Sequence, residues 1–141
     1  MFKKLRKSFR ETKEHLERQR AIDRRDVKRQ RSQLTDFTRV RRTFEVAGMF
    51  AYPAEVTAAQ LAVGARVRLI REPRNAYDPN AVAIIGPAGR LRWGYMPATL
   101  AKQYAPVMDR GVKFNAVITR LYGDGGEIDD AEITVFPPKL T

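Results

Sequence analysis

Cysteine is absent from this sequence of 141 residues, and histidine occurs once, as His15. The lack of cysteine excludes a disulfide framework and thiolate zinc sites. One histidine leaves little basis for a zinc site or for a nucleophile activated by a histidine base. His15 lies among charged residues, which is typical of a surface position. We therefore expect no bound metal, no cofactor and no catalytic site.

Long apolar runs are also absent, and none approaches the about 20 residues that a membrane-spanning helix requires. The start of the chain, residues 1–7, is basic, but no apolar segment follows it, so it does not predict a secretory signal. A phosphate loop of the G-x-x-x-x-G-K-[ST] type does not occur either. We expect a cytoplasmic protein that is not an enzyme.

The positive charge is concentrated in one part of the chain. Residues 1–43 contain sixteen Lys and Arg against six Asp and Glu, whereas residues 44–141 contain eleven against ten. Hydrophobic residues make up 43% of the chain, which suffices for one core. We expect a basic extension over 1–43, one domain over 44–137 and a short tail over 138–141. Such an asymmetry indicates a basic segment that meets a polyanion.

Residues 1–34 contain neither Gly nor Pro and are rich in good helix formers, so we expect a helix there. Apolar side chains recur at three- and four-residue spacing from Phe2 to Leu34, but polar residues interrupt this seam. It is too thin to predict a coiled coil. A solvated helix that gains stability on docking is the simpler interpretation.

After residue 43 the pattern changes to short strands separated by turn residues. We expect strands at 44–50, 66–70, 81–85, 91–95, 112–121 and 131–136. In the strand at 66–70, basic and apolar residues alternate, which predicts that Val67 and Leu69 face the core. A short helical turn is expected near 54–60, and a helix should run from Pro97 to Gly111. The pattern predicts a mainly β protein, a small barrel with one or two short helices, rather than a parallel sheet.

Residues 71–80 combine turn-forming residues with many hydrogen-bonding groups. Pro73, Asn75, Asp78 and Pro79 all favour turn geometry. The segment also carries guanidinium groups, two carboxylates, an amide and a phenol, and it leads directly into the apolar strand at 81–85. It is therefore the part of the sequence that best predicts a polar binding site.

Several motifs, in order, resemble the HIRAN domain family. They are Val46-Ala47-Gly48, Val67-Arg68-Leu69, Arg71-Glu72-Pro73, Asn75 to Val82, Gly94-Tyr95-Met96-Pro97 and Leu100-Ala101. The resemblance covers residues 44–137, and the basic extension lies outside it, as in a stand-alone bacterial-type member with an added helix. It implies a modified OB-like barrel. In fork-remodelling members this domain captures the 3′-hydroxyl end of single-stranded DNA.

The resemblance also implies site residues. Asn75 and Asp78 match the loop positions that hold the terminal nucleotide, and Tyr95 takes the place of a polar ring. A carboxylate accepts the proton of a terminal hydroxyl and repels a continuing phosphate, which selects an end. The two Asx side chains can equally bond their own turn. The predicted nucleic-acid-binding residues are Tyr52, Arg71, Asn75, Asp78, Tyr95 and Phe136.

One part of the sequence departs from the DNA-end-binding members. Where they have Arg-Tyr-Tyr after the first strand, this chain has Phe50-Ala51-Tyr52, without the arginine and one stacking ring. Tyr77 is expected to pack rather than bind, and Trp93 is expected in the core. Candidate phosphate contacts are Arg66, Arg68, Arg74 and Arg92, although basic alternation on a strand also suits a solvated face.

Two further local patterns have simple interpretations. Arg71 beside Glu72 predicts an ion pair between neighbours. The segment 123–130 gathers four acidic residues without the spacing of a Ca²⁺ loop, and it predicts a hairpin tip that nucleic acid avoids.

Two functions follow from these observations. The first is a non-catalytic module for single-stranded DNA or its 3′ ends, in repair or at replication forks, with the extension adding phosphate contacts. RNA remains open as the ligand. The alternative is an adaptor whose residues 1–34 bind an acidic protein partner or an anionic membrane surface. Phe2, Leu5 and Phe9 among basic residues fit the membrane version.

Overall fold

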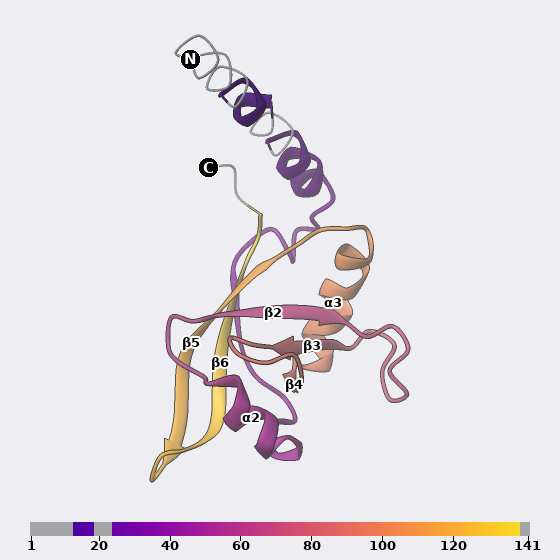
Figure 1. Cartoon of the computed structure of the whole chain (residues 1–141). Helices are drawn as coiled ribbons and strands as arrows, with labels where there is room; N and C mark the ends of the chain where they lie inside the picture. The colour runs from indigo at the N-terminus through magenta and orange to yellow at the C-terminus, as the bar shows by residue number, and fades with distance from the viewer. Residues whose placement is uncertain (1–12, 19–23, 139–141) are drawn as a thin grey trace, which may run out of the picture.

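The computed structural model describes residues 13–18 and 24–138, and its body is one curled antiparallel sheet (Figure 1). The six strands follow the order β1-β6-β5-β2-β3-β4. They are β1 (Arg42–Glu45), β2 (Arg66–Arg71), β3 (Val82–Ile85), β4 (Arg92–Tyr95), β5 (Asn115–Asp124) and β6 (Glu127–Phe136). The helices of the body are η1 (Met49–Ala51), α2 (Pro53–Ala59) and α3 (Ala98–Asp109). The predicted mainly β, barrel-like fold with short helices is confirmed.

The two edges of the sheet meet, which closes the curl on one side. Just after β1, the N–H of Ala47 donates to the carbonyl of Tyr95 in β4 at 2.8 Å, and the N–H of Tyr95 donates back at 2.9 Å. Gly94 permits this approach, because a Cβ at that position would collide with the side chain of Val46. The closure places the segment that follows Ala47 next to β4.

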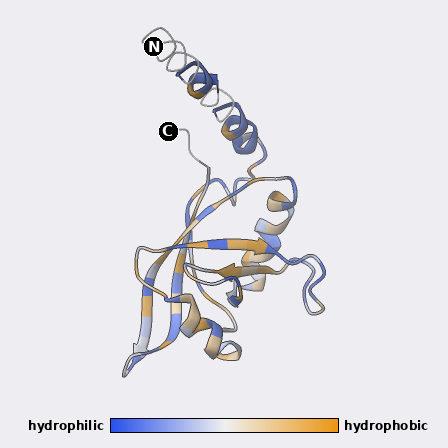
Figure 2. Ribbon diagram, viewed as in Figure 1, coloured by the Kyte–Doolittle hydropathy of each residue, from blue (hydrophilic) through white to orange (hydrophobic). Residues whose placement is uncertain are grey.

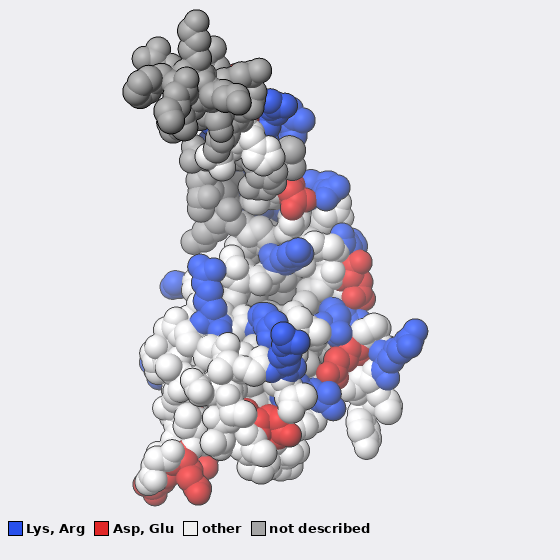
Figure 3. All heavy atoms as spheres, in the orientation of Figure 1, with Lys and Arg blue, Asp and Glu red and all other residues white. Residues whose placement is uncertain are grey.

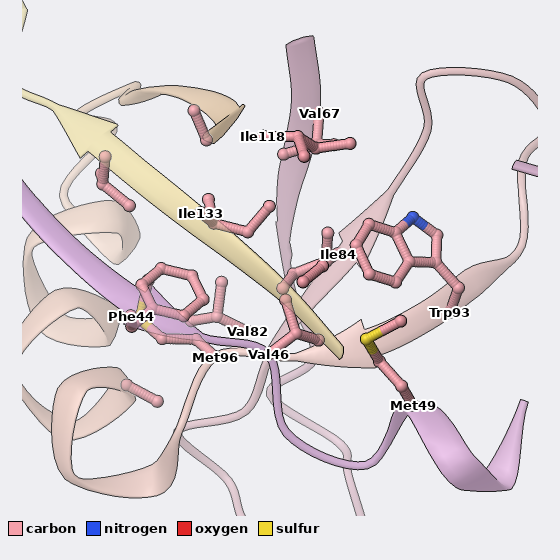
Figure 4. Close-up of a cluster of buried hydrophobic side chains, with 14 of the residues drawn as sticks. Phe44, Val46, Met49, Val67, Val82, Ile84, Trp93, Met96, Ile118 and Ile133 are labelled. Atoms are coloured by element: carbon pink, nitrogen blue, oxygen red, sulfur yellow. The ribbon is translucent and has the colours of Figure 1, made fainter. Parts of the chain in front are cut away.

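The core fills the inside of the curl, where side chains from several strands and from η1 meet (Figure 4). Trp93 is completely buried, as predicted, and its Nε1 donates to the carbonyl of Gly86 at 2.6 Å. Val67 is buried and Leu69 packs against the core, so the predicted alternation of β2 is also confirmed. Hydrophobic residues accordingly concentrate in the body rather than in the N-terminal helix (Figure 2).

Residues 13–18 and 24–32 are helical, which agrees with the predicted helix in that part of the extension. The remainder of the predicted segment, 1–12 and 19–23, lies outside the described residues. Within the described part of the chain, no helix has both the length and the apolar character needed to cross a membrane.

The N-terminal helix is attached to the body at the C-terminal end of α3. Leu34 is buried in a small cluster with Val107 and Val112. The guanidinium of Arg110 donates to the carbonyl of Gln33 at 3.3 Å. This attachment ties the end of the described helix 24–32 to the body.

Three predicted strands differ from the observed ones by more than one residue, and one of them, 112–121, is observed as β5 at Asn115–Asp124. The segment 44–50 is not one strand: β1 ends at Glu45, and Gly48, with φ of 76°, leads into η1. The acidic segment 123–130 does form a hairpin tip, but its turn is confined to Gly125 and Gly126, both with positive φ. Because the neighbouring residues pair in the ladder, β6 begins four residues earlier than predicted, at Glu127.

Candidate nucleic-acid interface

A pocket of about 750 Å³ opens between the β2–β3 loop, β4 and the residue preceding α2. We call it the Tyr52–Tyr95 pocket. Six of the ten residues predicted to contact nucleic acid line it: Tyr52, Arg74, Asn75, Asp78, Arg92 and Tyr95. Side chains that come from three separate segments of the sequence thus share one concavity.

The β2–β3 loop keeps its shape through its Asx side chains. Oδ1 of Asn75 accepts the N–H groups of Tyr77 at 2.9 Å and Asp78 at 3.1 Å, and Oδ1 of Asp78 accepts the N–H of Asn80 at 2.8 Å. The structural role that turn chemistry predicts is therefore real. Among the described residues nothing donates to Oδ2 of Asp78, so this oxygen is available to a ligand.

Arg71 does not line the pocket and instead holds the β2–β3 loop in place. Its guanidinium donates to the carbonyls of Ala81 at 2.6 Å and Pro79 at 2.9 Å, and it pairs with Asp109 of α3 at 2.9 Å. The predicted ion pair with Glu72 is wrong, because Asp109 is the closer carboxylate. Arg71 therefore fixes the two ends of the loop to each other and to α3.

Two aromatic rings and one cation form the wall of the pocket. The ring centroids of Tyr52 and Tyr95 lie 6.3 Å apart with an angle of 52° between planes. The Cζ atom of Arg92 lies 5.7 Å and 5.9 Å from these two centroids. This combination offers a face for stacking and a positive charge for phosphate.

The carboxylate of Glu72 organises this wall. Its Oε1 accepts hydrogen bonds from the hydroxyl of Tyr95 at 2.7 Å and from Nδ2 of Asn75 at 3.0 Å. Its Oε2 lies 3.5 Å from Nη1 of Arg92. The sequence did not single out this role, because the partners of Glu72 in β4 lie about twenty positions further along the chain.

Local interactions set the protonation of two groups in the wall. Burial raises the pKa of the Tyr95 hydroxyl, and the hydrogen bond to Glu72 raises it further. A hydrogen bond with Tyr52 raises the pKa of the Arg92 guanidinium. At neutral pH the pocket therefore presents a neutral phenol beside a permanent cation.

The other predicted residues lie elsewhere. Arg66 is exposed on β2 opposite Val117, and Arg68 donates to the carbonyl of Gly89 at 3.1 Å. Phe136 ends β6, opposite Asn115 of β5. The structure thus does not bring these three residues to the Tyr52–Tyr95 pocket.

Tyr77 corrects another expectation. It does not pack: its side chain is 99% exposed and lies at the rim of the pocket. The turn that Asn75 stabilises holds it outward. A fully exposed ring beside two inward rings adds a further surface on which a base can stack.

Charge is distributed unevenly over the visible face of the molecule. Figure 3 shows Lys and Arg over the described part of the N-terminal helix and much of the body, whereas the hairpin tip at the bottom carries acidic side chains and acidic side chains elsewhere lie among the basic ones. No group of three or more His, Cys, Asp or Glu side chains within the described residues could hold a metal ion. The arrangement of the pocket suits binding through stacking and hydrogen bonds.

Residues 41–133 match the family model described as the HIRAN domain. A protein of Oryza sativa subsp. japonica named Fanconi-associated nuclease 1 homolog is 42% identical over 53 residues. That match covers 36% of this chain but only 6% of the rice protein, so this chain spans a small part of its relative.

Two solved structures share the fold. A crystal structure of a protein from Lactobacillus plantarum matches with a TM-score of 0.56 and 26% identity, covering 68% of this chain and 93% of that one. The HIRAN domain of human HLTF matches with a TM-score of 0.53 and 22% identity, covering 71% of this chain and 78% of that one.

Proposed function

This chain belongs to the HIRAN domain family, and on that premise we propose that it binds single-stranded DNA and takes the 3′ end into the Tyr52–Tyr95 pocket. HIRAN domains are DNA-binding modules that are not catalytic by themselves. The single strand and its 3′ end are what the resemblance to fork-remodelling HIRAN members implies, and the chemistry of the pocket supports a hydroxyl end.

The observation that carries this proposal is the convergence of stacking rings, a cation and an end-selecting carboxylate in one concavity. Its volume of about 750 Å³ lies within the range of about 300–1,000 Å³ that is usual for small-ligand pockets, so a terminal nucleotide fits better than a duplex. Tyr52 and Tyr95 supply faces for a base, and exposed Tyr77 extends the stacking surface.

Charge favours a free hydroxyl end. The available oxygen of Asp78 accepts the proton of a 3′-hydroxyl, and the same oxygen repels a phosphate at that place. We assign to Arg92, whose side chain is 48% exposed, the contact with the phosphate that precedes the terminal nucleotide. A 3′-phosphate should therefore bind more weakly than a 3′-hydroxyl.

The basic extension adds contacts that do not depend on sequence. Its described helical residues include Arg25, Lys28 and Arg31, all of which are exposed. Cations on a helix bind phosphates by releasing counterions, so this part of the affinity falls with salt. The pocket selects the end while the extension holds the strand.

The setting we propose is DNA repair or replication-fork processing in the cytoplasm. The printed name of the rice relative, a Fanconi-associated nuclease homolog, supports a nucleic-acid context. The family assignment supports binding without catalysis by this domain.

A competition experiment tests the proposal. A labelled single strand with a 3′-hydroxyl is bound to the full chain, and anisotropy is followed as unlabelled oligonucleotides are added. The strand with a 3′-hydroxyl should compete best, ahead of the 3′-phosphate strand, a strand whose 3′ end is blocked, a blunt duplex and RNA. Equal competition by blocked and free 3′ ends would contradict end capture, and preference for duplex or RNA would contradict the choice of ligand.

A further inference from the structure

A second groove, of about 560 Å³, lies between α2 and the tip of the β5–β6 hairpin. Apolar side chains line part of it, among them Phe50, Val56 and Ile128. The side chain of Phe50 is 91% exposed. An exposed aromatic side chain beside an apolar groove is typical of a protein-binding surface.

The hairpin side of this groove is acidic. Glu127 and Asp129 line it, and the exposed carboxylates of Asp124 and Asp130 flank it. The acidic tip is visible in Figure 3, well apart from the basic N-terminal helix. Four carboxylates repel nucleic acid, so the groove fits an occupant that is both apolar and cationic.

The first ten residues of this sequence have both properties. They contain five basic residues and no acidic one, and three large apolar residues recur at a spacing that places them on one helical face. The basic residues are Lys3, Lys4, Arg6, Lys7 and Arg10, and the apolar ones are Phe2, Leu5 and Phe9. We propose that residues 1–10 of a second copy of this chain bind the groove.

The positions of the N-terminal helix and the groove favour the N-terminus of a second copy as the occupant over the N-terminus of the same molecule. The N-terminal helix is attached beside the start of β5, and the groove lies at the other end of that strand. Ten residues of β5 span about 34 Å at about 3.4 Å per residue. Figure 1 shows the N-terminal helix directed away from the hairpin tip. The N-terminus of a neighbouring molecule can bind the groove without spanning the length of β5.

The contact is heterologous, because it joins two different surfaces. Because the described N-terminal helix is attached at the opposite end of β5 from the groove, we expect a head-to-tail chain rather than a closed dimer. Because attraction between exposed charges drives it, the association should weaken as salt increases. This self-association is separate from the proposed DNA binding and requires no DNA.

Sedimentation velocity of the full chain without DNA tests this proposal. We expect wild-type protein at low salt to associate progressively through the micromolar range and to dissociate at high salt. The groove variant, Glu127→Lys with Asp129→Lys, should remain monomeric. The N-terminal variant, Lys4→Glu with Lys7→Glu, should also remain monomeric when it is alone.

Mixing the two variants gives the sharpest result. The groove variant keeps an intact N-terminus and the N-terminal variant keeps an intact groove, so together they should form a one-to-one dimer that cannot extend. A mixture that stays monomeric would overturn the proposal. So would a wild-type protein that is monomeric at every concentration, or one that stops at a closed dimer.

A matched control separates the groove from net charge. Asp36→Lys with Glu45→Lys makes the same change in charge at exposed positions outside the groove. This variant should associate as wild type does, and a loss equal to that of the groove variant would overturn the assignment of the site. Circular dichroism of each variant checks that the fold is retained.

Discussion

The hydroxyl of Tyr95 donates a hydrogen bond to Oε1 of Glu72 over 2.7 Å. The same carboxylate holds the amide of Asn75 and faces the guanidinium of Arg92. One side chain at the end of β2 therefore orients three binding groups from two different segments. Groups held in place before a ligand arrives reduce the ordering cost of binding.

Two substitutions separate the ring of Tyr95 from its hydroxyl. Y95A removes both, and loss of base stacking should weaken binding of single-stranded DNA by about 1–3 kcal/mol. Y95F keeps the ring and loses only the bond to Glu72, so it should bind more tightly than Y95A. Anisotropy titrations with a single strand measure both. Equal losses in the two variants would show that the hydroxyl, not the ring, carries the contact.

The raised pKa of Tyr95 makes stability depend on alkaline pH. The folded chain holds the phenolic proton more tightly than the unfolded chain does. This contribution is complete below the ordinary tyrosine pKa of about 10 and is lost as pH rises from there toward the raised value. The free energy of unfolding should therefore fall with pH above about 10.

Y95F provides the comparison for that pH dependence. Its free energy of unfolding, measured by urea denaturation at a series of alkaline pH values, should fall less steeply than that of the wild type. Some slope should remain, because burial also raises the pKa of Tyr104. Identical slopes in the two proteins would contradict the protonation argument.

The charge of Asp78 can be removed without breaking its turn. D78N keeps an Oδ1 that accepts the N–H of Asn80, whereas D78A removes the acceptor as well. D78N should reduce the preference for a 3′-hydroxyl over a 3′-phosphate by about tenfold, which is about 1.4 kcal/mol. Paired competition titrations measure this ratio. D36N changes an exposed carboxylate outside the pocket and should leave the ratio unaltered, and an unaltered ratio in D78N would remove Asp78 from end selection.

Local chemistry made much of this structure predictable. Proline and Asx residues act on their own turn, so the β2–β3 loop and its position before β3 follow from residues 71–80. The alternation of β2 and the single apolar face of α3 are likewise local. The prediction of one strand over 44–50 was wrong because apolar residues face the core in both β1 and η1. The pattern of apolar residues therefore does not reveal that the strand ends before the turn at Gly48.

The interactions that organise the pocket depend on tertiary structure instead. Arg71 is the last residue of β2 and Glu72 is the first residue after it. Their side chains nevertheless contact different elements, because Arg71 pairs with Asp109 of α3 while Glu72 accepts from Tyr95 of β4. The pocket residues also depend on the bridge between Ala47 and Tyr95, which no local pattern predicts.

Arg71 should matter more for stability than for direct contact with DNA. Its side chain is only 13% exposed, and R71A would remove the donor to the Pro79 carbonyl and to Asp109, whereas the Ala81 carbonyl would keep the N–H of Glu72. Hydrogen bonds to a charged group are each worth about 1.5–3 kcal/mol, so R71A should lower the free energy of unfolding by about 2–3 kcal/mol.

Urea denaturation of R71A and of R74A measures the difference. Arg74 is exposed in the same loop, and R74A should change the free energy of unfolding by no more than about 0.5 kcal/mol. A stable R71A that binds DNA poorly would instead assign Arg71 to the ligand.

The N-terminal helix should contribute affinity but not end selection. Replacing Arg25, Lys28 and Arg31 by Gln removes three exposed charges and keeps good helix formers. If each contacts a phosphate, the slope of log affinity against log salt should become less negative by about 2, since each contact on a single strand contributes about 0.7. R29Q is the matched control, because Arg29 is already paired with Asp26 at 2.8 Å and should contribute less to the slope.

The preference for a 3′-hydroxyl over a 3′-phosphate should be the same in the triple variant and the wild type. A change in that preference with no change in slope would reverse the two roles, because it would place end selection in the helix and phosphate binding in the body.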